Sequence, residues 1–128
     1  MKTPIPNVHF PMIESGRIQI RGDRGKIKLP IKNILFLESE INYTLIYTTD
    51  GKKYLSAYTL GIYETLLTSK AEFVRTHRDT LVNMNYAETV ELQSNRRGMI
   101  KLNTGKQIQV SRRKMPLVIQ RNHELMRA

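Results

Sequence analysis

Apolar and polar side chains alternate along much of the chain in short runs, which are separated by turn-forming residues. Beyond Gly16, the apolar residues Ile18 and Ile20, and then Ile27 and Leu29, recur with a period of two. That period is typical of strands with one buried face, and two glycines between the pairs supply a turn. The pattern therefore predicts two short antiparallel strands.

Six further strands follow from the same reasoning. Asp50-Gly51 between two β-rich runs is a strong hairpin signal, because both positions of such a turn favour positive φ. By contrast, residues 73–82 mix apolar and polar side chains and are expected to turn at the surface around Thr76–Asp79. The expected strands are Asn33–Ser39, Tyr43–Thr49, Lys52–Ala57, Thr89–Gln93, Met99–Leu102 and Gln107–Val110.

Two short helices complete the predicted elements. Thr59 is a suitable N-cap for an amphipathic helix that ends near Ser69. Ser111 is expected to cap a second helix over residues 112–126, in which Pro116 removes a backbone hydrogen bond and delays or kinks the start. The sequence thus predicts a mainly β fold with minor helices.

The length and composition indicate one folded domain. A chain of 128 residues has material for one core, and its 40% hydrophobic and 25% charged residues are near the globular average. Residues 1–15 contain three prolines and little periodicity, so we expect an extended N-terminal arm followed by a single domain over residues 16–128.

Several classes of protein are disfavoured by what the sequence contains. The absence of cysteine excludes disulfides, cysteine-ligated zinc and thiol catalysis. The apolar runs are too short to span a membrane, and the first residues lack the apolar core of a signal peptide. We therefore expect a cytoplasmic protein without a membrane partner.

Basic residues are in large excess and are unevenly distributed. Twenty-one Lys and Arg against eleven Asp and Glu give a formal charge of +10. Eight of the carboxylates lie between residues 38 and 91, whereas residues 92–123 contain eight basic residues and no acid. Such a stretch produces a positive face, the usual footprint of a phosphate backbone, although a solvated basic surface without a partner is the alternative.

The sequence offers little support for an enzyme. His77, Asp79 and Ser111 are the one trio suited to nucleophilic catalysis, and no glycine-rich elbow surrounds the serine. The three histidines have no metal-binding spacing, and no nucleotide-binding glycine motif is present. We expect no catalysis, metal, cofactor or small-molecule substrate.

Four polar clusters are candidates for binding. Arg112–Lys114 directly follows an expected strand at a predicted helix start, where backbone amides and long cations can hold a phosphate. Arg96-Arg97 lies in an expected hairpin loop and fits a plain surface equally well. His77 fits a structural role better than a binding role, and Asn42-Tyr43, which could contact adenine and phosphate, is a weak signal alone.

Seven short motifs in order resemble the LytTR DNA-binding domain of bacterial response regulators. The resemblance runs from about Gly16 to Leu125. The motifs are Phe36-Leu37-Glu38-Ser39, Asn42-Tyr43, Asp50-Gly51-Lys52, Glu64-Thr65-Leu66-Leu67, Phe73-Val74-Arg75-Thr76-His77-Arg78, Val82-Asn83 and Val110-Ser111-Arg112-Arg113.

The resemblance implies an elongated stack of short, mostly antiparallel sheets rather than a helix-turn-helix. It also implies that three loops enter successive major grooves. Asp79 and Pro116 depart from the family pattern. Because about fifteen residues precede the first expected strand, we expect no receiver domain within this sequence; it is either a whole protein that is regulated in another way or a fragment that has lost its switch. The DNA-contacting residues implied by the resemblance and by the basic triplet are Asn42, Tyr43, His77, Arg78, Arg112, Arg113 and Lys114.

From the residues and the resemblance together, we expect a sequence-specific transcriptional regulator. Its partner is double-stranded promoter DNA with direct repeats, and a second copy is expected on the adjacent repeat. Two alternatives stay open: a module that binds RNA or any polyanion, and a partner that does not bind DNA and titrates other regulators.

Overall fold

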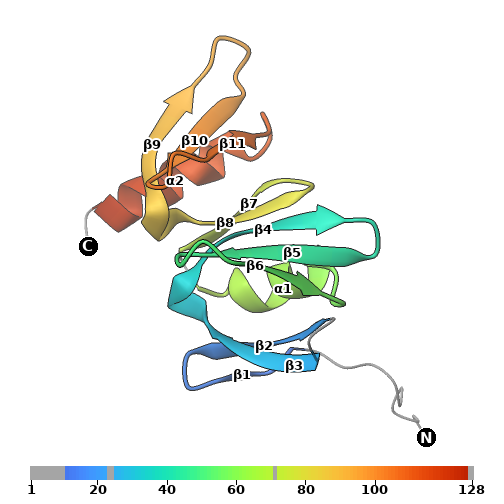
Figure 1. Cartoon of the computed structure of the whole chain (residues 1–128). Helices are drawn as coiled ribbons and strands as arrows, with labels where there is room; N and C mark the ends of the chain where they lie inside the picture. Colours follow the sequence, from blue (N-terminus) through green and yellow to red (C-terminus); the bar gives the residue numbers. More distant parts are fainter. Residues whose placement is uncertain (1–10, 23–24, 71, 127–128) are drawn as a thin grey trace, which may run out of the picture.

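The computed structural model describes residues 11–22, 25–70 and 72–126, and these form three antiparallel sheets stacked along the molecule (Figure 1). Two α-helices, α1 (Leu60–Leu67) and α2 (Met115–Met126), and two 3₁₀ turns, η1 (Ile31–Asn33) and η2 (Met84–Tyr86), accompany the strands. The strands are β1 (Ile13–Glu14), β2 (Arg17–Gly22), β3 (Gly25–Pro30), β4 (Ile34–Glu40), β5 (Tyr43–Thr48), β6 (Lys53–Ser56), β7 (Phe73–His77), β8 (Thr80–Asn83), β9 (Ala87–Leu92), β10 (Gly98–Leu102) and β11 (Gln107–Val110).

The predicted fold class is confirmed. Five strands separate α1 from α2, so these two helices do not form a helix-turn-helix. The sheets have the strand orders β1-β2-β3, β6-β5-β4-β8-β7 and β11-β10-β9. The five-stranded sheet lies in the middle of the stack (Figure 1).

Both faces of the central sheet are covered, which explains why β4 begins with four consecutive buried apolar residues. Leu37 on one face packs with α1 and the sheet β1-β2-β3. Phe36 on the other face packs with α2 and the sheet β9-β10-β11. A strand buried on both faces loses the alternation that marks a half-exposed strand, so the molecule has two apolar cores, one on each side of the central sheet.

The sheet β1-β2-β3 docks closely on the edge strand β6. The Ala57 N–H donates a hydrogen bond of 2.6 Å to the Arg21 carbonyl, and a Cβ at Gly22 would lie 1.9 Å from the Leu55 carbonyl oxygen. Only glycine permits such a close approach of two backbones. The tip of the predicted turn after Gly22 lies outside the described residues.

The predicted hairpin at Asp50-Gly51 is confirmed, with a different backbone conformation. Gly51 has a φ of 80°, but Asp50 does not have a positive φ. Instead, the Asp50 carboxylate accepts hydrogen bonds from the Thr48 hydroxyl at 2.5 Å and the Lys52 N–H at 3.2 Å. The bond from Thr48 is the largest cause of a lowered Asp50 pKa.

Strand β1 lies within the expected N-terminal arm and pairs with β2; the first ten residues of that arm lie outside the described residues. The predicted start of the second helix is wrong. Helix α2 begins at Met115 rather than Arg112, and residues 112–114 form a turn. Pro116 then falls in the first helical turn, where its missing N–H costs no hydrogen bond.

The turn expected at Thr76–Asp79 is shorter than predicted. Thr76 is fully buried within β7, and its hydroxyl lies 2.7 Å from the Thr80 hydroxyl, which satisfies the buried polar group. The register between β7 and β8 shifts between Arg75 and His77, so Thr76 is an extra residue that forms a β-bulge.

Thr59 caps α1 as predicted, but through its backbone: its carbonyl accepts from the Ile62 N–H. Ser111 is not the cap of α2, which begins four residues later; its carbonyl accepts from the Lys114 and Met115 N–H groups and closes the turn ahead of the helix. Within the described residues, neither the Thr59 nor the Ser111 side chain makes a capping hydrogen bond. Neither helix of the described part is long and apolar enough to cross a bilayer.

Candidate nucleic-acid interface

Three turns lie next to one another on one side of the molecule. They join β4 to β5, β7 to β8 and β11 to α2, and all three lie on the right in Figure 1. The Ser39 N–H donates to the Asp79 carbonyl at 2.8 Å, which joins the end of β4 to the β7–β8 turn. The Ser111 N–H donates to the Thr76 carbonyl at 2.9 Å, which joins the β11–α2 turn to β7. Backbone hydrogen bonds therefore hold these turns in a fixed order.

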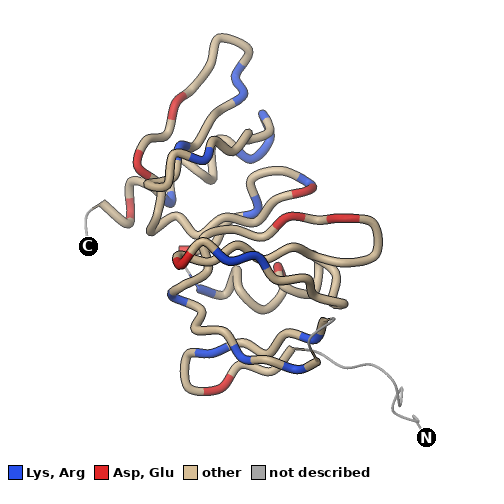
Figure 2. The backbone as a smooth tube through the Cα atoms, viewed as in Figure 1, with Lys and Arg blue, Asp and Glu red and all other residues tan. Residues whose placement is uncertain are grey.

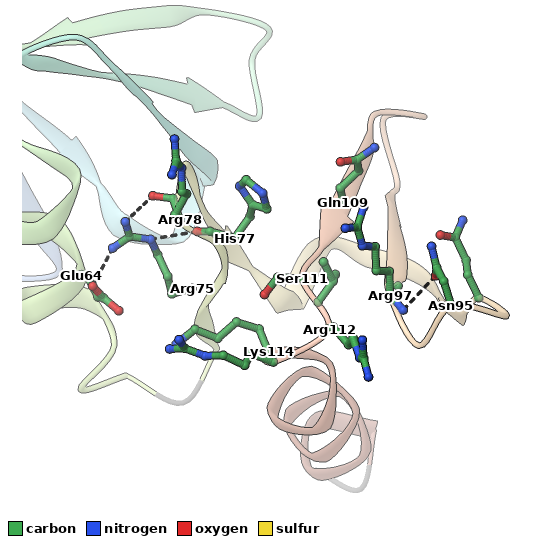
Figure 3. A pocket seen from close by; sticks show the side chains of 14 residues that line it. Glu64, Arg75, His77, Arg78, Asn95, Arg97, Gln109, Ser111, Arg112 and Lys114 are labelled. Carbon is green, nitrogen blue, oxygen red and sulfur yellow. Dashed lines mark hydrogen bonds and ion pairs between the residues drawn. The ribbon is translucent and has the colours of Figure 1, made fainter.

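A cleft of about 880 Å³ lies between the second and third turns and the β9–β10 hairpin (Figure 3). Five of the seven predicted site residues line it, namely His77, Arg78, Arg112, Arg113 and Lys114. The other residues of the lining are Glu64, Arg75, Gln93, Asn95, Arg97, Gly98, Gln109, Val110 and Ser111.

The cleft is strongly cationic. Six Lys and Arg residues line it against a single carboxylate, that of Glu64. Arg97, Arg112, Arg113 and Lys114 form no ion pair with any described residue. Figure 2 shows these positive segments near the start of β10 and at the β11–α2 turn. Their charges are uncompensated, so they are available to an anion.

The third turn is held rigidly at both ends. Val110, at the end of β11, and Met115, at the start of α2, are 1% and 2% exposed and belong to the same apolar core. Between these anchors, Arg112 and Arg113 are exposed and Lys114 is half-buried. The sequence pattern of strand, three cations and helix therefore positions the cations ahead of the first helical residue.

The second turn displays Arg78 at its tip. Its side chain is 88% exposed, and its Nε lies 3.9 Å from Asp79 Oδ1. His77 Nδ1 accepts the Asp79 N–H at 3.3 Å, which fixes the ring against the turn. Asp79, the departure noted in the sequence, therefore has a cation within reach that offsets its repulsion of phosphate.

The first turn is not part of the cleft. Asn42 occupies the left-handed region with a φ of 69°, and Tyr43 begins β5 and is 39% exposed. Residues 38–48 contain no Lys or Arg. The structure thus separates Asn42 and Tyr43 from the cationic residues, although their turn lies on the same side of the molecule.

The sequence alone does not identify several of the residues that line the cleft. Gln109 could have been found, because it alternates with buried Ile108 and Val110 on β11 and so faces away from the core. The sequence does not decide whether Arg97 is functional or plain surface. Arg75 and Glu64 lie in two of the family motifs, but the sequence does not predict their pairing, since their proximity depends on the packing of α1 against the central sheet.

No metal-binding cluster occurs among the described residues. Within the same part of the chain, every buried side-chain polar atom has a hydrogen-bond partner. The structure thus provides no orphaned polar group that would point to a buried ligand.

A comparison with family sequences identifies the domain. The sequence model of the LytTR family, described as "LytTr DNA-binding domain", matches residues 24–121. The chain belongs to the LytTR family. The resemblance inferred from the seven motifs is therefore confirmed.

A LytTR domain of known structure has the same fold. It is the LytTr DNA-binding domain of a Bacillus cereus protein described as a methyl-accepting/DNA response regulator. The TM-score is 0.72 at 20% sequence identity, and the match covers 84% of this chain and 97% of the other. No curated protein matches the chain.

Proposed function

We propose that this LytTR domain is a sequence-specific transcriptional regulator that inserts its three turns into successive grooves of promoter DNA. The observation that carries the proposal is the row of adjacent turns, joined through Ser39 and Asp79 and through Thr76 and Ser111. Loops on a rigid scaffold can enter grooves without a recognition helix. Membership of a DNA-binding family supports the same function.

The third and second turns supply the cationic contacts in this proposal. Arg112 and Arg113 are exposed on a rigid turn, and an arginine fork can bind the O6 and N7 edge of guanine. Arg78 is positioned at the tip of its turn for the same chemistry, with His77 beside it. Lys114 is assigned to the phosphate backbone, because an ammonium group acts there as a point charge.

The first turn supplies uncharged contacts. Asn42 can form two hydrogen bonds with the edge of adenine, and the Tyr43 hydroxyl can bind a phosphate. Because no cation lies within residues 38–48, this turn adds selectivity rather than electrostatic affinity. It depends on the cationic cleft for attachment to DNA.

Arg97 extends the proposed contact surface. It lines the same cleft from the β9–β10 hairpin, and its backbone N–H donates to Asn95 Oδ1 at 3.0 Å within that loop. Free of any ion pair with the described residues, it is placed to hold a backbone phosphate beside the third turn.

We further propose that two copies occupy direct repeats about one helical turn apart. Sites one helical turn apart, roughly 34–36 Å, present their grooves to the same side of the duplex. A second copy on an adjacent repeat would then lie on the same side of the DNA.

Selection from a randomised duplex library at near-physiological salt tests this function. Enrichment of a repeated motif, bound on the order of a thousandfold or more tightly than a scrambled duplex, is expected. Equal and steeply salt-dependent binding to every duplex would contradict it and would support a sequence-neutral polyanion-binding module. No binding to any duplex, with capture of a receiver-containing regulator, would instead support the titrating partner.

RNA recognition through stacked bases has less structural support. Phe36 and Tyr47 stack on each other at 4.3 Å between ring centroids, and Phe36 is buried. Tyr63 is also fully buried, and Tyr43 is the one aromatic residue among the exposed large hydrophobic residues of the described part. Single-stranded nucleic acid is usually bound on exposed aromatic faces, which the described surface offers at only one position.

A further inference from the structure

Arg75 lines the cationic cleft, yet each of its three guanidinium nitrogens donates a hydrogen bond within the protein. Its Nη1 donates to Glu64 Oε1 at 2.6 Å. Its Nε donates to the His77 carbonyl at 2.9 Å, and its Nη2 donates to the Arg78 carbonyl (Figure 3). The side chain is 19% exposed, in contrast to the 88% of Arg78. Arg75 therefore differs from Arg97, Arg112 and Arg113, which form no ion pair with any described residue, and from Arg78, whose exposed side chain lies 3.9 Å from one carboxylate, that of Asp79.

The three acceptors determine what Arg75 holds together. His77 and Arg78 form the end of β7 and the tip of the β7–β8 turn, and both are proposed to contact DNA. Glu64 lies on α1, which is anchored in the core by the fully buried Tyr63 and Leu67. The guanidinium group thus ties the carbonyls of a turn to a helix that is fixed elsewhere in the fold.

The chemistry of this arrangement requires arginine. Its planar fork presents several N–H donors in fixed directions, whereas a lysine ammonium group is a single point donor. One nitrogen cannot occupy the three positions that the Glu64 carboxylate and the two carbonyls define. The carboxylate also compensates a cation that is four-fifths shielded from water.

The β-bulge at Thr76 makes such support necessary. An extra residue in β7 interrupts the ladder with β8 immediately before the turn. Thr76 itself is held by the Thr80 hydroxyl and by the N–H of Ser111. The carbonyls of His77 and Arg78, which follow the bulge, are held by Arg75 instead.

We propose that Arg75, held by Glu64, is a positioning residue that fixes the shape in which the β7–β8 turn presents His77 and Arg78 to DNA. This inference rests on the proposed function for its DNA readout. If Arg75 only positions the turn, it contributes to the selectivity of DNA binding and not to the electrostatic attraction of DNA. A cation that contacts phosphate would instead contribute to the attraction and not to the selectivity.

The test compares Arg75→Gln, Arg75→Lys and Glu64→Gln with Arg97→Gln as the matched control. Affinities for the selected duplex and for a scrambled duplex are measured across a salt series. A general loss of folded protein lowers both affinities in the same proportion, so their ratio isolates the shape of the turn. Thermal melting of each variant reports folding separately.

Arg75→Gln and Arg75→Lys are expected to lower the affinity for the selected duplex by about tenfold or more. The affinity for the scrambled duplex and the salt slope should remain unchanged in Arg75→Lys and in the double variant of Arg75→Gln with Glu64→Gln, because both conserve the net charge of the cleft. Glu64→Gln should cause a smaller loss in the same direction, and adding it to Arg75→Gln should cause no further loss. Arg97→Gln should weaken both duplexes alike and reduce the salt slope by about one.

Three results would overturn the proposal. One is that Arg75→Gln behaves like Arg97→Gln, which would make Arg75 a phosphate contact. Another is that Arg75→Lys retains the wild-type ratio of affinities, which would show that charge alone suffices. The third is an unchanged ratio in Arg75→Gln. If Arg75→Gln does not fold, Glu64→Gln, which keeps both carbonyl contacts of Arg75, takes its place in the test. An unchanged ratio of the affinities for the selected and the scrambled duplex in Glu64→Gln would then overturn the proposal.

A measurement without DNA separates this inference from the proposed function. Backbone ¹⁵N relaxation of Arg78 and Asp79 should show a rigid turn in the wild type, with order parameters near 0.85, and values below about 0.6 in Arg75→Gln. Unchanged order parameters would overturn the positioning role. If the wild type prefers no duplex, the proposed function fails, and relaxation alone decides whether Arg75 holds the turn.

Discussion

The three cations of the β11–α2 turn are adjacent in sequence but differ in their surroundings. Arg112 and Arg113 are exposed, whereas Lys114 is half-buried and its N–H is bonded to the Ser111 carbonyl. A planar fork and an ammonium group also recognise different parts of DNA. At the scale of the residue, we therefore expect different losses when each side chain is removed.

Arg112→Ala and Arg113→Ala distinguish base contact from phosphate contact. Removing an arginine that binds guanine with two hydrogen bonds should cost about 1–3 kcal/mol on the selected duplex and relax the preference at one position. Lys114→Ala should weaken all duplexes alike and reduce the salt slope by about one. Affinity measured on a set of single-base variants of the site checks both expectations. If neither arginine variant changes the affinity, the assignment of the third turn is wrong.

Asn42→Gly tests the contribution of one side chain of the first turn to DNA binding. Asn42 has a φ of 69°, which glycine adopts without strain, so the melting temperature should be maintained. If the amide binds adenine, the free energy of binding to the selected duplex should become less favourable by about 1–3 kcal/mol. The salt slope should not change. Equal affinities of wild type and variant would remove Asn42 from the interface.

At the scale of the element, the sheet β1-β2-β3 depends on one close approach of two backbones. Gly22 lies against the Leu55 carbonyl of β6, and the neighbouring Arg21 carbonyl accepts the Ala57 N–H. Ile18 and Ile20 on β2 are buried in the core that this contact closes. The position of this sheet is therefore coupled to the edge of the central sheet.

Gly22→Ala should destabilise the protein because its Cβ would overlap backbone rather than a flexible side chain. The expected loss in the free energy of unfolding is about 1–3 kcal/mol, measured by urea denaturation. Gly61→Ala on α1 is the control, since a Cβ there meets nothing within 4 Å. It should stabilise the helix by up to about 1 kcal/mol. Equal stabilities of the two variants would contradict the role of the close approach.

At the scale of the whole molecule, the sequence predicted the set of elements better than their contacts. The strand Gln107–Val110 agrees with β11, because its alternation is clear and turns bound it. The start of α2 was placed three residues early, because the composition of the basic triplet does not distinguish a turn from a helix. The four consecutive polar residues at 76–79 predict a turn that includes Thr76, whereas a hydroxyl partner from β8 permits burial of Thr76 within β7.

Only part of the candidate site could be predicted, because the sequence shows its charges and motifs but not its contacts. Charge and family motifs identified the cations of the second and third turns, which the structure brings into one cleft. They could not identify the pairing of Glu64 with Arg75, which are eleven positions apart in sequence and meet through the packing of α1 against the central sheet. Nor could they show that Asn42 and Tyr43 lie outside the cleft.

The central claim is that three adjacent turns on one side of the molecule contact DNA together. Titration of the ¹⁵N-labelled protein with its selected duplex, followed by amide chemical shifts, tests this claim most directly. The largest changes are expected in three segments, residues 40–43, 76–79 and 111–114. Changes concentrated instead on the sheet β1-β2-β3, or on the exposed face of α2 around Ile119, would contradict the claim.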